Sequence, residues 1–348
     1  MEKILFLAHT DDDGALPKAA REVLRAAVDL SKQLGAETTV GLFGREVEAA
    51  ADSVASCGAR FLGVAGEDFA APRAATDVAA MAALVRAAAP TIVVAPTTSR
   101  IARAIPAAAA RVGGRVDTRV TGIGGEGGEL RLQRWYYRQR MLATQTRAHR
   151  PWFLVVESGI FATWEGASGA AAVEEVDVQV GDALRRTRVR GVESAQTTAQ
   201  TIRPEAELLF VAGAGWTKKQ ADGATHPKDA ERLILGFLEK AKASLGGSKS
   251  LVDQSGKGEA VLTFMTHLNQ VGQTGSTPRH AKGLATCCHG EEPHVVGWRF
   301  VRERRAVNLD PNCGWAQGKT DVLYVADAFQ VMEKVNALLA AGQVAAPK

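Results

Sequence analysis

The segment Asn269–His280 (NQVGQTGSTPRH) concentrates polar groups in a way that could serve a ligand. It contains two glycines, a proline and six hydroxyl or amide side chains, with no large apolar residue after Val271. Such a segment cannot bury itself, so it is either a solvated surface loop or a set of donors arranged around a bound group.

Two glycine-rich segments could contact phosphates. Gly213–Lys218 (GAGWTK) directly follows the apolar run ELLFVA and precedes a helix-forming stretch, which is where α/β sheets bind phosphates. Glycines that merely turn the chain explain it equally well. Gly122–Gly127 matches GxGxxG but leads into another strand, so we interpret it as a hairpin turn. In Pro96–Arg100 the hydroxyls favour helix capping over anion binding.

Other chemistry has less support. Cys287 and Cys288 are adjacent and have no CxxC partner, so we expect small buried side chains and no metal site. No Ser/His/Asp or paired-carboxylate spacing indicates hydrolysis, and we assign no catalytic residue.

Composition narrows the class of protein. The chain has 348 residues, 46% hydrophobic and 23% charged, with a net charge of +4, which is too mild to imply nucleic acid. In the basic run Arg131–Arg150 we favour a basic β-ribbon over a nucleic-acid surface. The first residues have no signal-peptide pattern and the four cysteines no disulfide framework, so we expect a cytoplasmic protein.

Hydrophobic periodicity predicts two α/β domains. In the first half, apolar runs alternate with helical patterns, which indicates a parallel sheet covered on both faces. The predicted strands are Lys3–Ala8, Thr38–Phe43, Arg60–Val64 and Thr91–Ala95, and the predicted helices are Leu16–Leu34, Glu46–Ser56, Asp77–Ala88 and Arg100–Val112. An antiparallel extension is then predicted from strands at Arg119–Ile123, Leu130–Tyr137, Met141–Thr146, Trp152–Val156 and Val173–Val180.

The second half restarts the alternation after a polar stretch. We predict an N-terminal domain over residues 1–189, a linker over 190–204 and a second, Rossmann-like domain with a C-terminal helix over 205–345, to which the resemblance described below assigns FAD binding. Its predicted strands are Glu207–Ala212, Ser250–Asp253, Gly283–Cys287, Arg305–Leu309 and Val322–Val325, with helices at Lys228–Leu245 and Asp327–Leu339. Glu259–His267 is an apolar segment of undecided type.

A series of motifs in this half resembles the electron transfer flavoprotein alpha subunit. They are GSKSLVD (Gly247–Asp253), QVGQTG (Gln270–Gly275), HGEEPH (His289–His294), AVNLDP (Ala306–Pro311) and Asp321. QVGQTG is the most specific of them. The first half fits the N-terminal domain of that family in strand order.

The resemblance implies an FAD and assigns residues to it. Ser248 and Lys249 would lie near the isoalloxazine, Gln273, Thr274 and Gly275 near flavin N5, and His294 near O2. His289 would lie in the phosphate-side loop, and Asn308 and Asp321 would hold the adenosine end. Gly213 and Gly215 complete the cofactor-binding set. A cation at Lys249 and a donor at His294 would stabilise the negative charge of a reduced flavin.

The resemblance also implies partners. These are a beta subunit in a heterodimer, a flavin-dependent dehydrogenase as electron donor and a membrane quinone oxidoreductase as acceptor, which makes the chain an electron carrier without substrate chemistry of its own. Lys249 stands where the family has arginine, the glycine loop lacks an arginine, and Glu291 and Glu292 would lie near the phosphates. The alternatives are a scaffold subunit without tight flavin binding and, ranked last, an NAD-dependent oxidoreductase, for which Glu231 and Glu239 fall inside a predicted helix.

Overall fold

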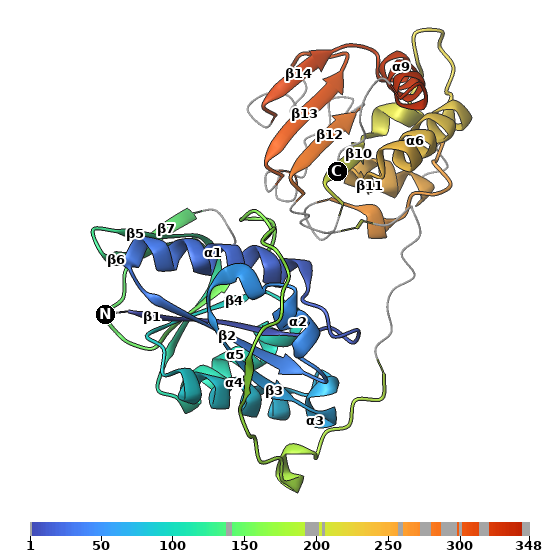
Figure 1. Ribbon diagram of the computed structural model, residues 1–348. Coiled ribbons are helices and arrows are strands. Elements are labelled where there is room, and N and C mark those ends of the chain that lie inside the picture. The colour runs from blue at the N-terminus through green and yellow to red at the C-terminus, as the bar shows by residue number, and fades with distance from the viewer. Residues whose placement is uncertain are drawn as a thin grey trace. The chain divides into compact units, whose positions relative to one another are not determined.

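The computed structural model divides the chain into two compact units, Met1–Val192 and Glu193–Lys348, each with its own sheet (Figure 1). The structure describes residues 2–136, 141–191, 202–203, 206–256, 260–271, 280–286, 298, 301–312 and 320–342. The predicted fold class, two α/β domains of which the first has an antiparallel extension, is confirmed.

The N-terminal unit is built on a nine-stranded sheet of order β7-β6-β5-β8-β4-β1-β2-β3-β9. Its strands are β1 (Lys3–His9), β2 (Glu37–Gly44), β3 (Arg60–Ala65), β4 (Ile92–Pro96), β5 (Arg115–Glu126), β6 (Glu129–Tyr136), β7 (Met141–Gln145), β8 (Trp152–Val156) and β9 (Val173–Glu175). Its helices are α1 (Lys18–Leu34), α2 (Glu48–Asp52), α3 (Glu67–Ala70), α4 (Ala74–Ala88) and α5 (Ser99–Arg111), with 3-10 turns at Ala55–Cys57 and Asp182–Leu184.

Alternation along the buried strands divides the core of this unit into two layers. Ile4 and Phe6 of β1 pack in one cluster with α1, whereas Leu5 and Leu7 pack in the other with α4 and α5. This is the pattern of a parallel sheet with helices on both faces, because successive side chains of a strand point to opposite sides. Figure 1 shows α1 and α4–α5 on opposite sides of the sheet.

Only part of the predicted extension is antiparallel. β5 pairs with β6, and β6 with β7, in antiparallel fashion, but β8 lies parallel between β4 and β5. The last predicted strand shortens to β9, which pairs parallel with β3. Hydrophobic alternation identifies a strand but carries no information on its direction, which the connections determine.

The C-terminal unit has a parallel five-stranded sheet of order β11-β10-β12-β13-β14. The strands are β10 (Leu208–Ala212), β11 (Ser244–Gly247), β12 (Lys282–Thr286), β13 (Glu303–Asn308) and β14 (Val322–Val325). The helices are α6 (Pro227–Ala241), α7 (Lys249–Val252) and α9 (Ala328–Ala340), and 3-10 turns are η3 (Ala214–Thr217), η4 (Asp253–Gly256) and η5 (His267–Asn269).

The strand predicted at Ser250–Asp253 is wrong. Lys242 adopts the left-handed conformation and ends α6, so that the chain enters β11 six residues before the predicted strand. Ser248 then caps α7 by accepting a hydrogen bond from the Leu251 amide at 3.2 Å. A serine ahead of a short apolar run is typical of a helix N-cap, and here this signal outweighs the apolar content of Leu251 and Val252.

Candidate functional site

The carboxyl edge of the C-terminal sheet contains a reversal of strand order. β10 leads to β11 on one side and is flanked by β12 on the other, which makes the β10–β12 boundary a topological switch point. The two strand ends are joined there, since the Gly213 amide donates to the Thr286 carbonyl at 2.8 Å. Ligands of open α/β sheets bind in the crevice outside such a point.

The glycine loop after β10 is fixed by the side chains beneath it. Trp216 is fully buried, packs against Phe329 in a tilted arrangement with the ring centroids 4.6 Å apart, and donates its indole N–H to Thr286 Oγ1 at 2.9 Å. The side-chain amide of Gln220 donates through Nε2 to the backbone carbonyls of Gly215 and Lys218 at 3.0 and 2.6 Å. The loop is therefore held rigid. Gly213 is the N-cap of the short 3-10 turn η3, and α6 begins only at Pro227, so the two glycines do not open an α-helix.

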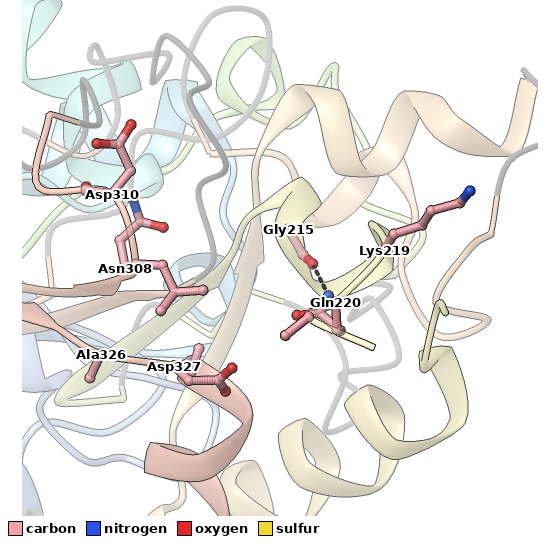
Figure 2. A pocket seen from close by; sticks show the side chains of 10 residues that line it. Gly215, Lys219, Gln220, Asn308, Asp310, Ala326 and Asp327 are labelled. Carbon is pink, nitrogen blue, oxygen red and sulfur yellow. Dashed lines mark hydrogen bonds between the residues drawn. The ribbon is translucent and has the colours of Figure 1, made fainter. Parts of the chain in front are cut away.

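A pocket of about 560 Å³ lies along the same edge (Figure 2). Its lining comes from the segments that follow β10, β13 and β14: Gly215, Lys219, Gln220, Ala221, Asn308, Leu309, Asp310, Ala326, Asp327 and Ala328. Asn308 is buried, and its side-chain amide donates through Nδ2 to the backbone carbonyl of Asp310 at 3.0 Å. Gly215 and Asn308, two of the predicted residues, therefore border one cavity.

Asp321 lies away from this pocket. It precedes β14 at the amino end of the strand, where its carboxylate accepts from the Arg304 amide at 2.6 Å and from the Arg304 guanidinium at 3.0 Å. The Arg304 amide and side chain hold the pKa of Asp321 below its usual range. Asn308 pairs with Val325 at the other end of the two strands, and four residues of strand separate the two positions by roughly 13 Å. The structure does not bring Asp321 and Asn308 together.

Asp327, in place of the predicted Asp321, is the carboxylate that borders the pocket near Asn308. It lines the pocket with Asn308 and caps α9, accepting from the Gln330 amide at 3.1 Å through Oδ1. Sequence reasoning placed Asp327 only at the start of the last helix. The signal that could have identified it is an acidic residue at the carboxyl end of a strand, which is where α/β folds hold a ribose.

Ser248 and Lys249 lie beside the end of β10. The Ser248 amide donates to the Ala212 carbonyl at 2.9 Å, and the Val271 amide donates to the Gly247 carbonyl at 3.0 Å. Ser248 is buried, whereas Lys249 is part-exposed and paired with Asp253. The hydrogen bond from Lys249, followed by that from His267, lowers the pKa of Asp253.

Five of the predicted residues lie outside the described residues: Gln273, Thr274, Gly275, His289 and His294. Glu291 and Glu292 also lie there. The neighbouring described residues, Val271 beside Gly247 and Thr286 beside Gly213, both belong to the edge that carries Ser248. Within the described part of the chain, no group of three or more His, Cys, Asp or Glu side chains is placed to hold a metal ion. No described helix is long and apolar enough to cross a membrane.

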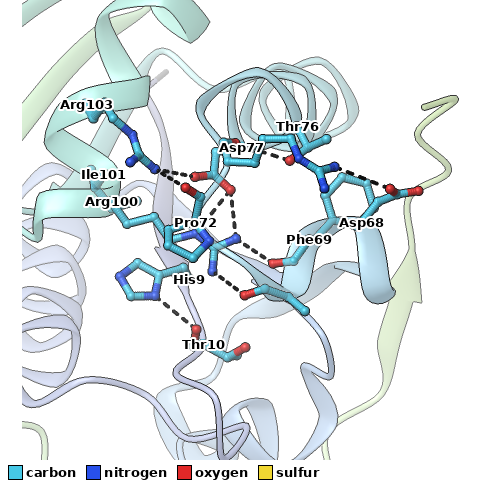
Figure 3. Close-up of polar contacts among 12 residues, drawn as sticks. His9, Thr10, Asp68, Phe69, Pro72, Thr76, Asp77, Arg100, Ile101 and Arg103 are labelled. Atoms are coloured by element: carbon cyan, nitrogen blue, oxygen red, sulfur yellow. Dashed lines mark hydrogen bonds and ion pairs between the residues drawn. The ribbon is translucent and has the colours of Figure 1, made fainter. Parts of the chain in front are cut away.

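The N-terminal sheet also has a switch point, between β1 and β4, and there the chain packs polar side chains tightly (Figure 3). His9 Nε2 lies 3.0 Å from Thr98 Oγ1, and His9 Nδ1 lies 3.0 Å from the Thr10 carbonyl. Thr98 also caps α5 by accepting from the Ile101 amide, as its sequence position predicted. Burial lowers the pKa of His9.

A buried ion pair lies next to His9. Arg100 donates to Asp77 at 2.7 Å and to the Phe69 and Ala70 carbonyls, and its guanidinium lies 5.0 Å from the centre of the Phe43 ring. Arg103 approaches the other oxygen of Asp77 at 3.3 Å. The sequence analysis did not detect this cluster, because its members come from four separate segments.

Two α/β units, the second with a fully parallel sheet and a pocket at its carboxyl edge, place the chain among the α/β proteins, whose ligands generally bind outside the carboxyl ends of the strands. Comparison with protein families is more specific: residues 4–180 match the electron transfer flavoprotein domain, which is about half of the chain. The chain therefore belongs to the electron transfer flavoprotein family, consistent with an alpha-type subunit. No curated protein matched the sequence.

Proposed function

We propose that the chain is the FAD-carrying alpha-type subunit of an electron transfer flavoprotein. The single observation that carries the proposal is the pocket at the carboxyl edge of the C-terminal sheet, which Asn308 and Asp327 border together with the glycine loop. Its volume is within the range of about 300–1,000 Å³ that is usual for small-molecule sites.

The donor set fits an adenine dinucleotide. Asp327 Oδ1 is engaged in the α9 cap, which leaves Oδ2 for a ribose hydroxyl. The glycine loop offers backbone without intervening side chains, and Lys219 follows it at the border of the same pocket, with its side chain extended away from Asn308 and Asp327 (Figure 2). Phosphates are bound by such backbone and cations. We propose that the flavin ring is contacted by Ser248, Lys249, Gln273, Thr274 and Gly275. We further propose that His289 lies on the phosphate side of the FAD and that His294 lies near the O2 edge of the flavin.

When bound, FAD would supply the reversible acceptance of one or two electrons. The residues of the chain would orient it and set the charge around it. Lys249 would favour the more negative state of the bound group, because a cation stabilises an anion in a partly desolvated site. The proposed partners are a beta subunit of the same family, a dehydrogenase as donor and a membrane quinone oxidoreductase as acceptor.

The proposal is tested by the absorption spectrum of the chain copurified with its partner subunit. We expect flavin bands at one flavin per complex, retained on gel filtration and bleached by a dehydrogenase with its substrate. A colourless, folded complex that does not take up added FAD would instead support a scaffold subunit. A complex that takes up NAD and not FAD would indicate an oxidoreductase.

A further inference from the structure

The charged groups around Asp253 form a chain of three that the family resemblance does not account for. Asp253 Oδ2 accepts from Lys249 Nζ, and its other oxygen, Oδ1, lies 2.9 Å from His267 Nε2. Asp253 thus stands between a permanent cation and a group that becomes a cation only when protonated. Histidine is the side chain whose ordinary titration falls between pH 5 and 8.

The backbone around this chain of charges is well anchored. His267 belongs to η5, which a capping box closes: Thr266 Oγ1 accepts from the Leu268 amide and Asn269 Oδ1 accepts from the Thr266 amide. Two residues later the Val271 amide donates to Gly247, the residue before Ser248. His267 and Lys249 are therefore held on two neighbouring segments of one edge, with Asp253 bridging them.

The charge balance of this edge depends on the state of His267. Among the described residues, the charged groups on the elements packed against η5 are Lys249 of α7 and Asp253 of η4, and β11 has none. With neutral imidazole the three groups sum to zero. With imidazolium they sum to +1. The carboxylate is 24% exposed, so it is partly shielded from solvent, whereas the imidazole is 66% exposed and can exchange its proton with solvent.

We propose that His267 is a positioning residue that, through Asp253, makes the cationic side of the flavin site depend on pH. This inference rests on the proposed function. When the bound group gains negative charge, the imidazole takes a proton from solvent at Nδ1, while Nε2–H remains on Asp253. Asp253 then pairs with two cations, so its negative charge offsets less of the positive charge of Lys249.

The test compares two variants that fix the charge of position 267 in the complete complex with FAD. His267→Gln is neutral at every pH and His267→Lys is positive throughout the working range. We expect the flavin midpoint potential of the lysine variant to be the higher one, because a cation favours the reduced flavin. The wild-type potential should follow the glutamine variant at high pH and approach the lysine variant as the pH falls toward 5.

The matched control is His226→Gln. His226 also pairs with a carboxylate, Asp222, at 2.7 Å, but it lies at the start of α6 and not next to Lys249. This variant should keep the wild-type dependence of potential on pH. Proton uptake on reduction, followed with an indicator dye, gives a second readout that should decrease in His267→Gln only.

The outcomes separate the two proposals. A yellow wild-type complex whose potential differs from that of His267→Gln by the same amount at every pH would overturn the role of His267 and leave the proposed function intact. A colourless wild-type complex would overturn both. Loss of flavin in His267→Gln but not in His267→Lys would show that the charge at position 267 reaches the site, in support of the inference.

Discussion

The two sheets of this chain reverse their strand order in the same way, but the edges at the two reversals differ in what fills them. At the N-terminal switch point, His9, Thr98, Arg100 and Asp77 satisfy one another in a tightly packed cluster. At the C-terminal one, glycine and backbone groups meet, and a pocket of about 560 Å³ runs along the edge. The fold offers a ligand position twice, and among the described residues the side chains leave it accessible at the second.

The difference also concerns the energetics of burial. Arg100 and Asp77 are largely withdrawn from solvent, which is costly for charges unless each is paired and hydrogen-bonded. Their network meets that condition and closes this edge, while burial still raises the pKa of the Asp77 carboxyl, so that loss of either partner would leave a buried charge uncompensated. In the C-terminal unit the charged groups at the pocket, Lys219, Asp310 and Asp327, line a cavity instead of filling it. Residues of the first kind should affect stability, and residues of the second kind should affect binding.

Replacing the carboxylate of the closed edge should have the largest effect. In Asp77→Ala, Arg100 would remain buried without its ion-pair partner, a change that typically costs about 3–5 kcal/mol. The free energy of opening of α4 and α5, measured by native-state hydrogen exchange of the full chain, should fall by that amount. The control is Asp29→Ala, which removes an exposed pair with Arg25 at 2.8 Å and should cost less than about 1 kcal/mol. Equal losses in the two variants would contradict the comparison.

Substitutions at the open edge of the C-terminal sheet should change the affinity for the ligand. Asp327→Ala is expected to weaken FAD affinity by roughly ten- to a hundredfold, since a hydrogen bond to a charged group contributes about 1.5–3 kcal/mol. It also removes the α9 cap, which costs about 1 kcal/mol of stability. Titration of the flavin-free complex with FAD measures the affinity.

Two further variants test whether the loss of FAD affinity is caused by the absence of the Asp327 carboxylate. Asp327→Ser keeps a capping oxygen without the charge, so stability should recover while affinity stays low. Asp321→Ala removes a carboxylate that is engaged by Arg304 and should change affinity less than about twofold. A loss of affinity in Asp321→Ala that equals the loss in Asp327→Ala would argue against the assignment of Asp327.

The sequence predicts the layers of the fold well and the edges less well. Continuous apolar runs such as ILFLA in β1 and VVA in β4 identify buried parallel strands, because only a sheet covered on both faces needs them. The direction of β8 and the pairing of β9 with β3 depend on contacts distant in sequence, which local periodicity does not encode. The helix α7 was predicted as a strand because Leu251 and Val252 are apolar, whereas the N-cap at Ser248 is the feature that determines a helix there.

The same limit applies to the site. Gly215 and Asn308 border one pocket, because Asn308 ends β13, Gly215 lies in the loop after β10, and all parallel strands end at one edge. Asp321 and Asp327 lie six residues apart, at opposite ends of β14, and the predicted strand Val322–Val325 already placed Asp327 beyond the carboxyl end, a signal that the motif assignment of Asp321 did not use. The N-terminal cluster was beyond sequence reasoning, since Asp77 lies inside a helix and resembles any solvated helical carboxylate.

The smallest effect concerns the pH dependence of the closed edge. Burial lowers the pKa of His9, so over the range between the unfolded and folded values the unfolded chain binds more protons. The stability that His9 contributes is therefore fully present above the unfolded pKa, about 6.5, and is lost as the pH falls through the lower folded value.

The measured quantity is the difference in opening free energy of the β1–β4 region between wild type and His9→Gln. It should decrease as the pH falls below neutrality, because glutamine retains a hydrogen-bonding group but does not titrate. A pH-independent difference for His9→Gln would show that the imidazole at the closed edge is not protonated on unfolding.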